Sequence, residues 1–386
     1  MVAQDLDRTR EAVQESPGWI GEDARLWAVV LAGGQGMRLR PLTRRIHGEA
    51  RPKQFAAVLG ARSLLRQTLD RAATAIPLAR TVAVTVDEHA GYVMHEIEQG
   101  LMPRVLEQPA DRGTAAGVLL PVHWVSRQDP EAIVVVLPSD HFIDDAERFM
   151  AHVEDVAAAA RAHPTWVVLL GALADTPDTQ YGWIEPGAQV GATGAGPIWR
   201  AKRFWEKPSP AQAVGCLRRG CLWNTFVLVA TARALVDLGR RYLPLLHARL
   251  APLSAFFDTE HERWAIRQAY APAPAANFSR AVLERCPPEL MVAQMPALTW
   301  SDLGTPRRVL RLARRLALPT PWLARMGGVA RRRPSRPLRG VLSGLGPDIS
   351  GRERWTPPVV RIHAASGNLG SARRQPRSRA GAAPAP

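Results

Sequence analysis

The sequence predicts an α/β protein in which helices cover both faces of a mostly parallel sheet. Two observations carry this prediction. Between residues 27 and 171, short apolar runs that fit buried strands alternate with segments of helical periodicity. Several runs, such as residues 133–137, are apolar throughout, which is typical of strands buried on both faces of a parallel sheet. We therefore expect a Rossmann-like arrangement, whose ligands bind at the carboxyl ends of the strands.

The elements of this sheet follow from local patterns in chain order. Residues 29–31 form a first apolar strand, and residues 33–43 have the glycine content of a loop. Residues 63–75 have helical spacing, with four apolar residues on one side: Leu64, Leu65, Leu69 and Ala72. The further elements expected up to residue 171 are strands at 81–86, 104–107, 133–137 and 166–171 and helices at 89–101 and 113–124.

The composition changes after residue 171. Prolines and glycines are frequent across 176–197, and five aromatic residues stand in polar company nearby: Tyr181, Trp183, Trp199, Phe204 and Trp205. We interpret this stretch as a small antiparallel excursion that covers one end of the ligand cleft. The elements expected beyond it are a strand at 222–230, a helix at 232–250, mostly helical structure across 251–290 and an amphipathic helix at 309–316.

Charge divides the chain into parts. The net charge is +15, of which residues 318–386, with thirteen arginines and two acidic residues, carry +11. This Arg/Pro-rich tail lacks the apolar periodicity of a packed core, and we expect it to be disordered. Residues 1–25 are expected to be a polar extension and residues 26–317 a folded domain. Weak tethering of the tail to nucleic acid or an anionic membrane is the less favoured alternative.

The sequence also bears on location. No run of eighteen apolar residues predicts a membrane span, and residues 1–26 lack the apolar segment of a secretory signal. Three cysteines, Cys216, Cys221 and Cys286, are too few and too irregularly spaced for a disulfide framework or a zinc site. We therefore expect a reducing, cytoplasmic location. A homo-oligomer is compatible with the sequence, which leaves the oligomeric state open.

The loop after the first strand predicts a phosphate-binding site. Its glycines, in Ala32-Gly33-Gly34-Gln35-Gly36, allow positive φ and a close approach of the backbone to an anion, and Arg38 adds a permanent charge. Two familiar phosphate loops do not fit. The dinucleotide fingerprint requires glycine where Leu39 stands, and the other loop requires Gly-Lys-Ser/Thr where Gly36 is followed by Met37-Arg38. Taken alone, the loop fits an ordinary turn equally well.

A second cation follows in Arg51-Pro52-Lys53-Gln54-Phe55. Together with residues 32–43, this motif resembles the signature of sugar-1-phosphate nucleotidyltransferases, and its Pro-Lys-Gln-Phe form is most similar to the mannose-1-phosphate guanylyltransferase branch. The resemblance extends over residues 26–312, so the domain expected at 26–317 is a nucleotidyltransferase domain. It implies that the loop binds the nucleoside triphosphate through Ala32, Gly33, Gly34 and Gly36. It also implies that Arg38 and Lys53 neutralise the phosphates during catalysis.

Two aspartates at strand ends are candidate metal ligands. Asp140 follows the most apolar strand, in Pro138-Ser139-Asp140-His141, and Asp302 lies in Trp300-Ser301-Asp302-Leu303-Gly304-Thr305. From the residues alone, each could instead cap the next helix. The resemblance implies that both hold Mg²⁺, which one or two carboxylates and substrate phosphates usually bind. It makes Asp140 catalytic, whereas we expect His141 to be structural.

The resemblance also assigns substrate contacts. It implies that Gln108, Gly113 and Thr114 bind base and ribose. These residues precede or begin an expected helix, whose free N–H groups could face a ligand. The family commonly has Asn-Thr where this chain has Gly113-Thr114, so the base stays open. For the sugar phosphate the implied residues are Tyr181, Gly182, Glu206, Lys207 and Asn224.

Three features weaken the sugar assignment. Glu206-Lys207 could form an ordinary surface ion pair. The glycine that often follows the family's Asn-Thr pair is missing after Asn224-Thr225, and Arg280 stands where the mannose enzymes usually have aspartate. The identity of the sugar therefore stays open.

The expected function is formation of a nucleoside-diphosphate sugar and pyrophosphate, with GTP and mannose 1-phosphate as the favoured substrates. Another sugar 1-phosphate or base, such as glucose 1-phosphate with UTP or dTTP, is one alternative. A catalytically silent sensor of sugar nucleotides is another, and nucleic-acid binding through the arginine tail is a third. The presence of all the charged catalytic positions favours the enzyme over the sensor.

Overall fold

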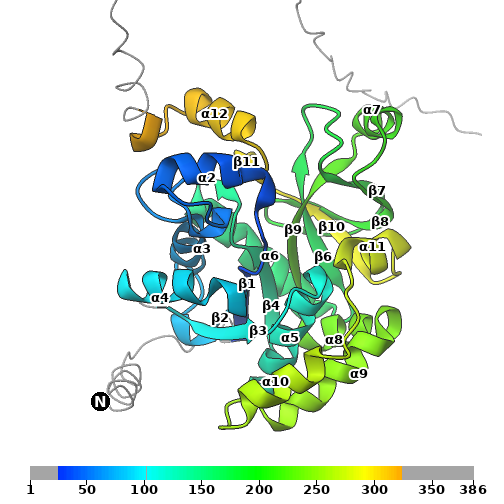
Figure 1. Ribbon diagram of the computed structural model, residues 1–386. Helices are drawn as coiled ribbons and strands as arrows, with labels where there is room; N and C mark the ends of the chain where they lie inside the picture. Colours follow the sequence, from blue (N-terminus) through cyan, green and yellow to red (C-terminus); the bar gives the residue numbers. More distant parts are fainter. Residues whose placement is uncertain (1–24, 101, 324–386) are drawn as a thin grey trace, which may run out of the picture. The chain divides into compact units, whose positions relative to one another are not determined.

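The computed structural model describes residues 25–100 and 102–323 (Figure 1). Apart from Arg25 and residues 318–323, the predicted N-terminal extension and the predicted disordered tail lie outside these residues. Within the described ranges, no helix is both long and apolar enough to cross a membrane. The cellular location predicted from the sequence stays a prediction.

A nine-stranded sheet forms the centre of the described domain (Figure 1). Its strands are β1 (Leu26–Leu31), β2 (Thr81–Val86), β3 (Arg104–Gln108), β4 (Ile133–Pro138), β6 (Val167–Leu173), β7 (Gly182–Thr193), β8 (Gly196–Glu206), β9 (Leu222–Thr231) and β10 (Leu290–Gln294). They lie in the order β3-β2-β1-β4-β9-β6-β10-β8-β7. The neighbours β3, β2, β1 and β4 are parallel, as are β6 and β10, while β9 and β8 run antiparallel to their neighbours. The mostly parallel sheet is thus confirmed, and the β7–β8 hairpin is the predicted antiparallel excursion.

Helices cover both faces of this sheet. Alternate residues of one strand face opposite cores, so that Val29 packs with α5 and α8 whereas Val30 packs with α3 and α6. This explains why the strands are apolar throughout. The helices are α2 (Arg40–His47), α3 (Leu64–Ala72), α4 (Ala90–Glu98), α5 (Gly113–Gln128), α6 (Ala146–Ala162), α7 (Pro210–Arg218), α8 (Ala232–Tyr242), α9 (Pro244–Leu250), α10 (Glu262–Tyr270), α11 (Phe278–Ala281) and α12 (Pro306–Arg315).

Four segments differ from the sequence-based expectations. The loop expected to extend to residue 43 ends earlier, because Pro41 takes an early position of α2, where its missing N–H costs nothing. The expected helix at 232–250 is broken before Pro244 into α8 and α9. Residues 251–290 are only partly helical, and strand β10 begins at their end. The expectations also lacked α6, although Asp145 caps its first turn by accepting from the Arg148 N–H.

A second, smaller sheet pairs β5 (Phe142–Ile143) with β11 (Trp300–Ser301) in antiparallel register. These short strands follow Asp140 and precede Asp302 in the sequence. Their pairing therefore brings two segments that are about 160 residues apart to the same end of the large sheet. A third apolar cluster, which includes Leu39 just before α2 and Val309 of α12, packs beside them.

A buried histidine gives the fold a predicted pH dependence. His123 of α5 lies 5.2 Å, between ring centroids, from His247 of α9, and burial together with the neighbouring His247 lowers the pKa of His123 to about 4. In the unfolded chain this imidazole takes up its proton near pH 6.5. The unfolded state therefore binds more protons below that pH, and stability is present above pH 6.5 and lost as the pH falls towards 4.

We expect His123 to account for about 2 kcal/mol of the free energy of unfolding lost between pH 7 and pH 5. Urea unfolding of the wild type and of His123→Leu at both pH values measures this, and the variant should lose less stability on acidification. His95→Leu is the matched control, because His95 is exposed. Equal losses in the wild type and His123→Leu would contradict the assignment.

Candidate active site

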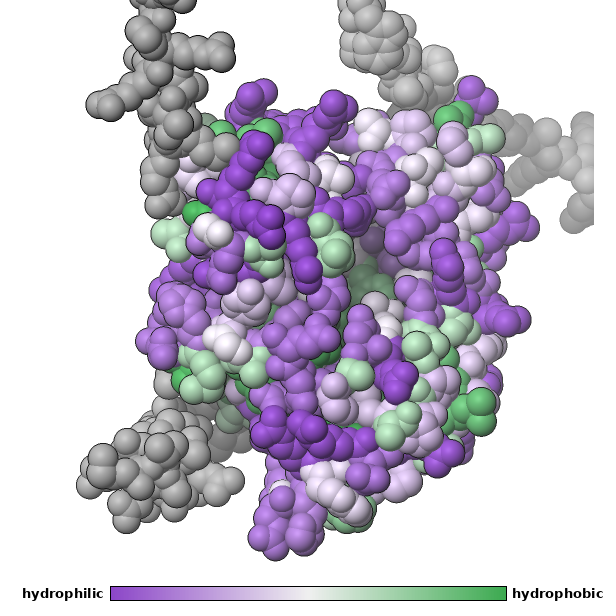
Figure 2. All heavy atoms as spheres, in the orientation of Figure 1, coloured by the Kyte–Doolittle hydropathy of each residue, from purple (hydrophilic) through white to green (hydrophobic). Residues whose placement is uncertain are grey.

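The candidate site lies where β1 and β4 end side by side. Both the backbone N–H and the hydroxyl of Ser139 donate to the Leu31 carbonyl oxygen, at 3.1 and 2.6 Å. These two bonds fix the start of the glycine loop against the segment that carries Asp140. Figure 2 shows this face of the molecule hollowed over β9 and β10, with a largely hydrophilic rim.

The glycine loop is shaped by a residue that the sequence analysis did not assign to the site. The buried Gln54 side chain donates from Nε2 to the carbonyl oxygens of Ala32 (2.8 Å) and Gly34 (2.7 Å). Gly36 has φ +58°, and a Cβ there would lie 2.8 Å from the Lys53 backbone nitrogen. The loop and the Lys53 segment therefore form one packed unit. The only sequence signal for Gln54 was its place beside Lys53.

Lys53 joins the two candidate metal ligands. Its Nζ lies 3.0 Å from Asp140 Oδ2 and donates to the Asp302 backbone carbonyl at 2.6 Å. The Lys53 side chain is 11% exposed, so solvent screens these contacts only in part. Three residues predicted from separate motifs, up to 249 positions apart, thus meet around one ammonium group.

The Asp302 carboxylate is held in a fixed orientation. Its Oδ1 accepts hydrogen bonds from the Tyr181 hydroxyl (3.1 Å), Arg308 Nη1 (2.7 Å) and the Gly304 N–H (3.0 Å). Burial opposes ionisation, but Lys53 and Arg308 outweigh it and lower the pKa of Asp302. Burial also raises the pKa of Tyr181, so its hydroxyl stays a donor. The carboxylate is therefore ionised, with Oδ2 left free of these three donors.

Arg38 lies at the open side of the site. Its guanidinium donates to Gln180 Oε1 at 2.9 Å and lies 3.9 Å from Asp302 Oδ2, and half of its side chain is exposed. A half-exposed arginine with one carboxylate at the limit of ion-pair distance can turn towards an incoming anion. The structure thus places Arg38, Lys53, Asp140 and Asp302 in one group.

His141 is half-buried beside this group and is neutral at pH 7. Burial lowers its pKa to about 4, and the Trp300 indole N–H donates to its Nδ1 at 3.3 Å. Its Nε2 therefore faces Asp140 Oδ1, 3.6 Å away. This arrangement supports the predicted structural role, since the ring links β11 to the Asp140 segment.

The donor set fits a hard divalent cation. The two carboxylates offer oxygen ligands: Asp140 Oδ2 is in contact with Lys53, and Asp302 has one carboxylate oxygen directed away from its hydrogen-bond donors. Among the described residues, no group of three or more His, Cys, Asp or Glu side chains could hold a metal ion. A cation bound here would thus rely on substrate oxygens and water for its other ligands, as Mg²⁺ commonly does.

The residues predicted to bind base and ribose are tightly packed against neighbouring segments of the chain. The buried Gln108 amide donates to the Thr85 carbonyl (3.1 Å) and accepts from the Tyr270 hydroxyl (3.0 Å). A Cβ on Gly33 would lie 3.1 Å from Gln108 Nε2, so the glycine loop rests on this amide. Thr114 Oγ1 accepts from the Phe278 N–H at 2.9 Å. The structure brings these residues together, and their nucleotide contacts stay a prediction.

Gly113 has a structural role that the sequence did not reveal. It has φ +79°, and a Cβ there would lie 2.4 Å from the Ala276 carbonyl oxygen. We expect Gly113→Ala to lower the free energy of unfolding by roughly 2 kcal/mol, measured by chemical denaturation. Gly91→Ala in α4 is the matched control, because nothing lies within 4 Å of a Cβ there, and it should be neutral or mildly stabilising. Equal stabilities of the two variants would contradict this expectation.

Most residues predicted to bind the sugar phosphate also meet. A Cβ on Gly182 would lie 3.2 Å from both Glu206 Oε2 and Asn224 Cβ. Burial raises the pKa of Glu206, and Lys207 Nζ lies 3.8 Å from its Oε1. Asn224 Oδ1 accepts from the Phe226 N–H at 3.0 Å. We call Gly182, Glu206, Lys207 and Asn224 the sugar-side group. Tyr181 does not belong to it, because its hydroxyl donates to Asp302.

Glu284 is a further residue of this region that sequence reasoning left without a role. Its Oε1 accepts from the Glu206 backbone N–H at 2.8 Å. The next residue, Lys207, has φ +52°, an uncommon conformation for a side chain of this type. The Glu284 contact therefore helps to fix the turn that carries both charged residues.

Comparisons with known proteins find relatives across the whole of this domain. A family model described as nucleotidyl transferase matches residues 27–317. The xanthan biosynthesis protein XanB of Xanthomonas campestris pv. campestris (strain B100) is 32% identical over 284 residues, which are 72% of this chain and 57% of that protein. A mannose-1-phosphate guanylyltransferase of Escherichia coli (strain K12) is 28% identical over 288 residues, 73% of this chain and 58% of that protein. The chain thus spans little more than half the length of these relatives.

Solved structures show the same fold. A Thermus thermophilus protein described as a mannose-1-phosphate geranyltransferase has a TM-score of 0.63 and 32% identity, with 74% of this chain and 79% of that chain covered. A Helicobacter pylori protein described as mannose-6-phosphate isomerase has a TM-score of 0.55 and 20% identity, and covers 72% of this chain and 100% of its own. At that identity the second likeness concerns the fold alone.

Proposed function

This chain belongs to the nucleotidyl transferase family, and we propose that it transfers a guanylyl group from GTP to mannose 1-phosphate. The products are GDP-mannose and pyrophosphate. The observation that carries the proposal is the contact of Lys53 with both Asp140 and Asp302. An ammonium group between the Asp140 carboxylate and the Asp302 backbone carbonyl, beside a glycine loop and Arg38, suits a triphosphate and a divalent cation.

The reaction requires positioning and charge neutralisation more than covalent help from the protein. A phosphate oxygen of the sugar 1-phosphate attacks the α-phosphorus, and pyrophosphate leaves in line. The attacking phosphate is already anionic at neutral pH and needs no general base, which agrees with a neutral His141. Arg38 and Lys53 offset the charge that develops on the phosphates.

The other residues have assigned roles in this proposal. Asp140 and Asp302 would hold Mg²⁺, which would supply charge neutralisation at the phosphates. The glycine loop, together with Gln108, Gly113 and Thr114, binds the nucleotide. Lys207 binds the sugar phosphate, and Glu206 and Asn224 accept or donate hydrogen bonds to sugar hydroxyls at the point where Gly182 leaves room.

The preference for GTP and mannose 1-phosphate rests on motif form and on the relatives. The Pro-Lys-Gln-Phe and Pro-Ser-Asp-His segments have the form typical of the mannose branch. The similar Escherichia coli protein is described as a mannose-1-phosphate guanylyltransferase. Arg280 stands where that branch usually has aspartate, and it lies near enough to Glu206 to affect its ionisation. This arginine is the residue most able to change the choice of sugar.

The test is pyrophosphate release from the purified chain with Mg²⁺, across four nucleoside triphosphates and several sugar 1-phosphates, including mannose and glucose 1-phosphate. We expect GTP with mannose 1-phosphate to be the most active pair and excess chelator to abolish turnover. If another pair, such as glucose 1-phosphate with UTP or dTTP, were the active one, the proposed substrates would be wrong and the proposed type of reaction would stand. If no substrate pair released pyrophosphate but the chain still bound sugar nucleotides, the proposed enzyme activity would be wrong and the chain would be a sensor of sugar nucleotides.

A further inference from the structure

A second cavity lies apart from the candidate active site. It has a volume of about 410 Å³ and opens between the end of β6, the segment before β11 and the last turn of α12. We call it the tryptophan pocket, because Trp223 and Trp300 line it. None of the residues predicted to bind nucleotide, sugar phosphate or metal is among its lining residues.

The sheet separates this pocket from the sugar-side group. Trp223 and Asn224 are neighbours in β9, so their side chains lie on opposite faces of the sheet. Asn224 belongs to the group around Gly182, whereas Trp223 packs in the core on the α3 and α6 side. A ligand of the tryptophan pocket would therefore not occupy the sugar side of the active site.

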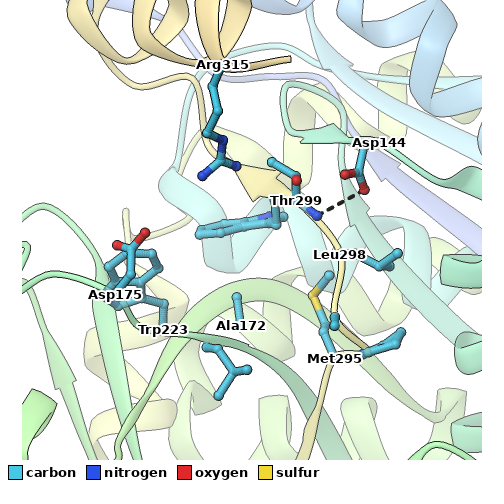
Figure 3. A pocket seen from close by; sticks show the side chains of 12 residues that line it. Asp144, Ala172, Asp175, Trp223, Met295, Leu298, Thr299 and Arg315 are labelled. Atoms are coloured by element: carbon cyan, nitrogen blue, oxygen red, sulfur yellow. Dashed lines mark hydrogen bonds between the residues drawn. The ribbon is translucent and has the colours of Figure 1, made fainter. Parts of the chain in front are cut away.

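The polar groups of the pocket are only partly satisfied. The buried indole Nε1 of Trp223 has no hydrogen-bond partner among the described residues. Within the same ranges, the Arg315 side chain makes neither an ion pair nor a hydrogen bond. Figure 3 shows Arg315 reaching from α12 into the pocket, with Asp144 and Asp175 on opposite sides. Each carboxylate has one oxygen engaged: Asp144 Oδ1 accepts from the Thr299 N–H at 2.9 Å, and Asp175 Oδ1 accepts from the Thr176 hydroxyl at 3.1 Å.

The apolar groups form the floor. Ala172, Met295 and Leu298 line the cavity together with the two indoles. A smaller cavity of about 100 Å³ shares several lining residues with it and adds Arg311, together with Tyr181 and Arg308, which both donate to Asp302. Within the described residues, the combined lining offers aromatic and apolar surface, two arginines without a carboxylate partner and carboxylates at the rim. A polyanion such as a nucleoside triphosphate would be repelled by these carboxylates, and a purely apolar ligand would leave the arginines unused.

We propose that the tryptophan pocket is a second small-molecule site, which takes a hexose monophosphate. The apolar face of a pyranose ring suits an indole and the apolar floor, and its hydroxyls donate to the Asp175 carboxylate. The single phosphate binds Arg315, with Arg311 nearby, because a guanidinium matches phosphate oxygens in geometry and charge. The volume is in the range of ordinary ligand cavities.

The site is placed to sense its ligand for the active site. The Tyr181 ring centroid lies 4.8 Å from that of Trp223 and 5.2 Å from that of Trp300, and the Tyr181 hydroxyl donates to Asp302. Arg308 of α12 holds the same carboxylate two turns before Arg315. The wall of the pocket is thus in direct contact with the groups that orient Asp302.

Isothermal titration of the full chain with mannose 6-phosphate, without nucleotide, tests the site. We expect saturable binding that Arg315→Ala weakens about tenfold or more, since a charge-assisted contact is lost. Arg314→Ala is the matched control, because Arg314 is an exposed arginine of the same turn that does not line the pocket. It should change the affinity less than about twofold. Unchanged melting temperatures confirm that both variants are folded.

Two further arms separate the alternatives. Asn224→Ala should retain binding, and loss of binding there would assign mannose 6-phosphate to the active site and overturn the proposal. Mannose and inorganic phosphate should each bind at least about tenfold more weakly than mannose 6-phosphate, because each supplies only half of the contacts. Inorganic phosphate that binds equally well would overturn the hexose assignment, as would equal effects of Arg315→Ala and Arg314→Ala or the absence of binding to the wild type.

Discussion

Replacing Asp140 by asparagine is expected to lower kcat/KM for pyrophosphate release by at least about a thousandfold. The substitution keeps the shape of the side chain and removes the negative charge that lies 3.0 Å from Lys53 Nζ. With only Asp302 left as a proposed charged ligand, we expect Mg²⁺ to bind more weakly, and the Lys53 ammonium loses its charged partner. The Mg²⁺ concentration for half-maximal activity should therefore rise along with the loss of turnover.

Steady-state assays over a range of Mg²⁺ concentrations measure both effects. Asp155→Asn is the matched control, because Asp155 is an exposed carboxylate of α6 outside the candidate site, and it should behave as the wild type. Circular dichroism and urea unfolding should show a folded protein in each case. If Asp140→Asn retained activity within tenfold of the wild type, Asp140 would not be a metal ligand.

The parts of the fold that the sequence predicted are those that local patterns encode. A fully buried strand requires apolar residues on both faces, so residues 133–137 could be recognised without knowledge of their neighbours. The break between α8 and α9 was missed, although Pro244 marks it in the sequence by disfavouring helical structure at the residue before it. Strand β10 was missed because its five residues follow a stretch with several helices. Only their pairing with β6 in the structure identifies them as a strand.

The candidate site shows the same division. Lys53, Asp140 and Asp302 each stand in a contiguous motif, so they could be chosen from the sequence, and the structure brings them together. The groups that orient them are different. Tyr181 reaches Asp302 across 121 positions, and the Tyr270 hydroxyl reaches Gln108 across 162. No periodicity or spacing encodes such contacts, because they depend on strand order and on which loop crosses which strand end.

The substitution Lys53→Met is expected to have two effects of opposite sign. It removes the cation proposed to offset the charge on the phosphates, so kcat/KM should fall by about a thousandfold. It also removes an ammonium group that contacts Asp140 Oδ2 and the Asp302 carbonyl. In the absence of substrates, a divalent cation no longer competes with that charge, and its affinity should rise about tenfold.

The two effects are measured separately, by steady-state kinetics and by binding of Mn²⁺ to the substrate-free chain followed by electron paramagnetic resonance. Lys202→Met is the matched control, because Lys202 pairs with Glu185 on the β7–β8 hairpin and is 64% exposed. It removes the same charge from the chain and should change neither quantity more than about twofold. Tighter Mn²⁺ binding together with slower turnover would show that the Lys53 ammonium and the metal cation compete at Asp140 and Asp302. Weaker Mn²⁺ binding in Lys53→Met would instead mean that Lys53 supports the metal site by holding Asp140 and Asp302 in place, and competition between the two cations would be excluded.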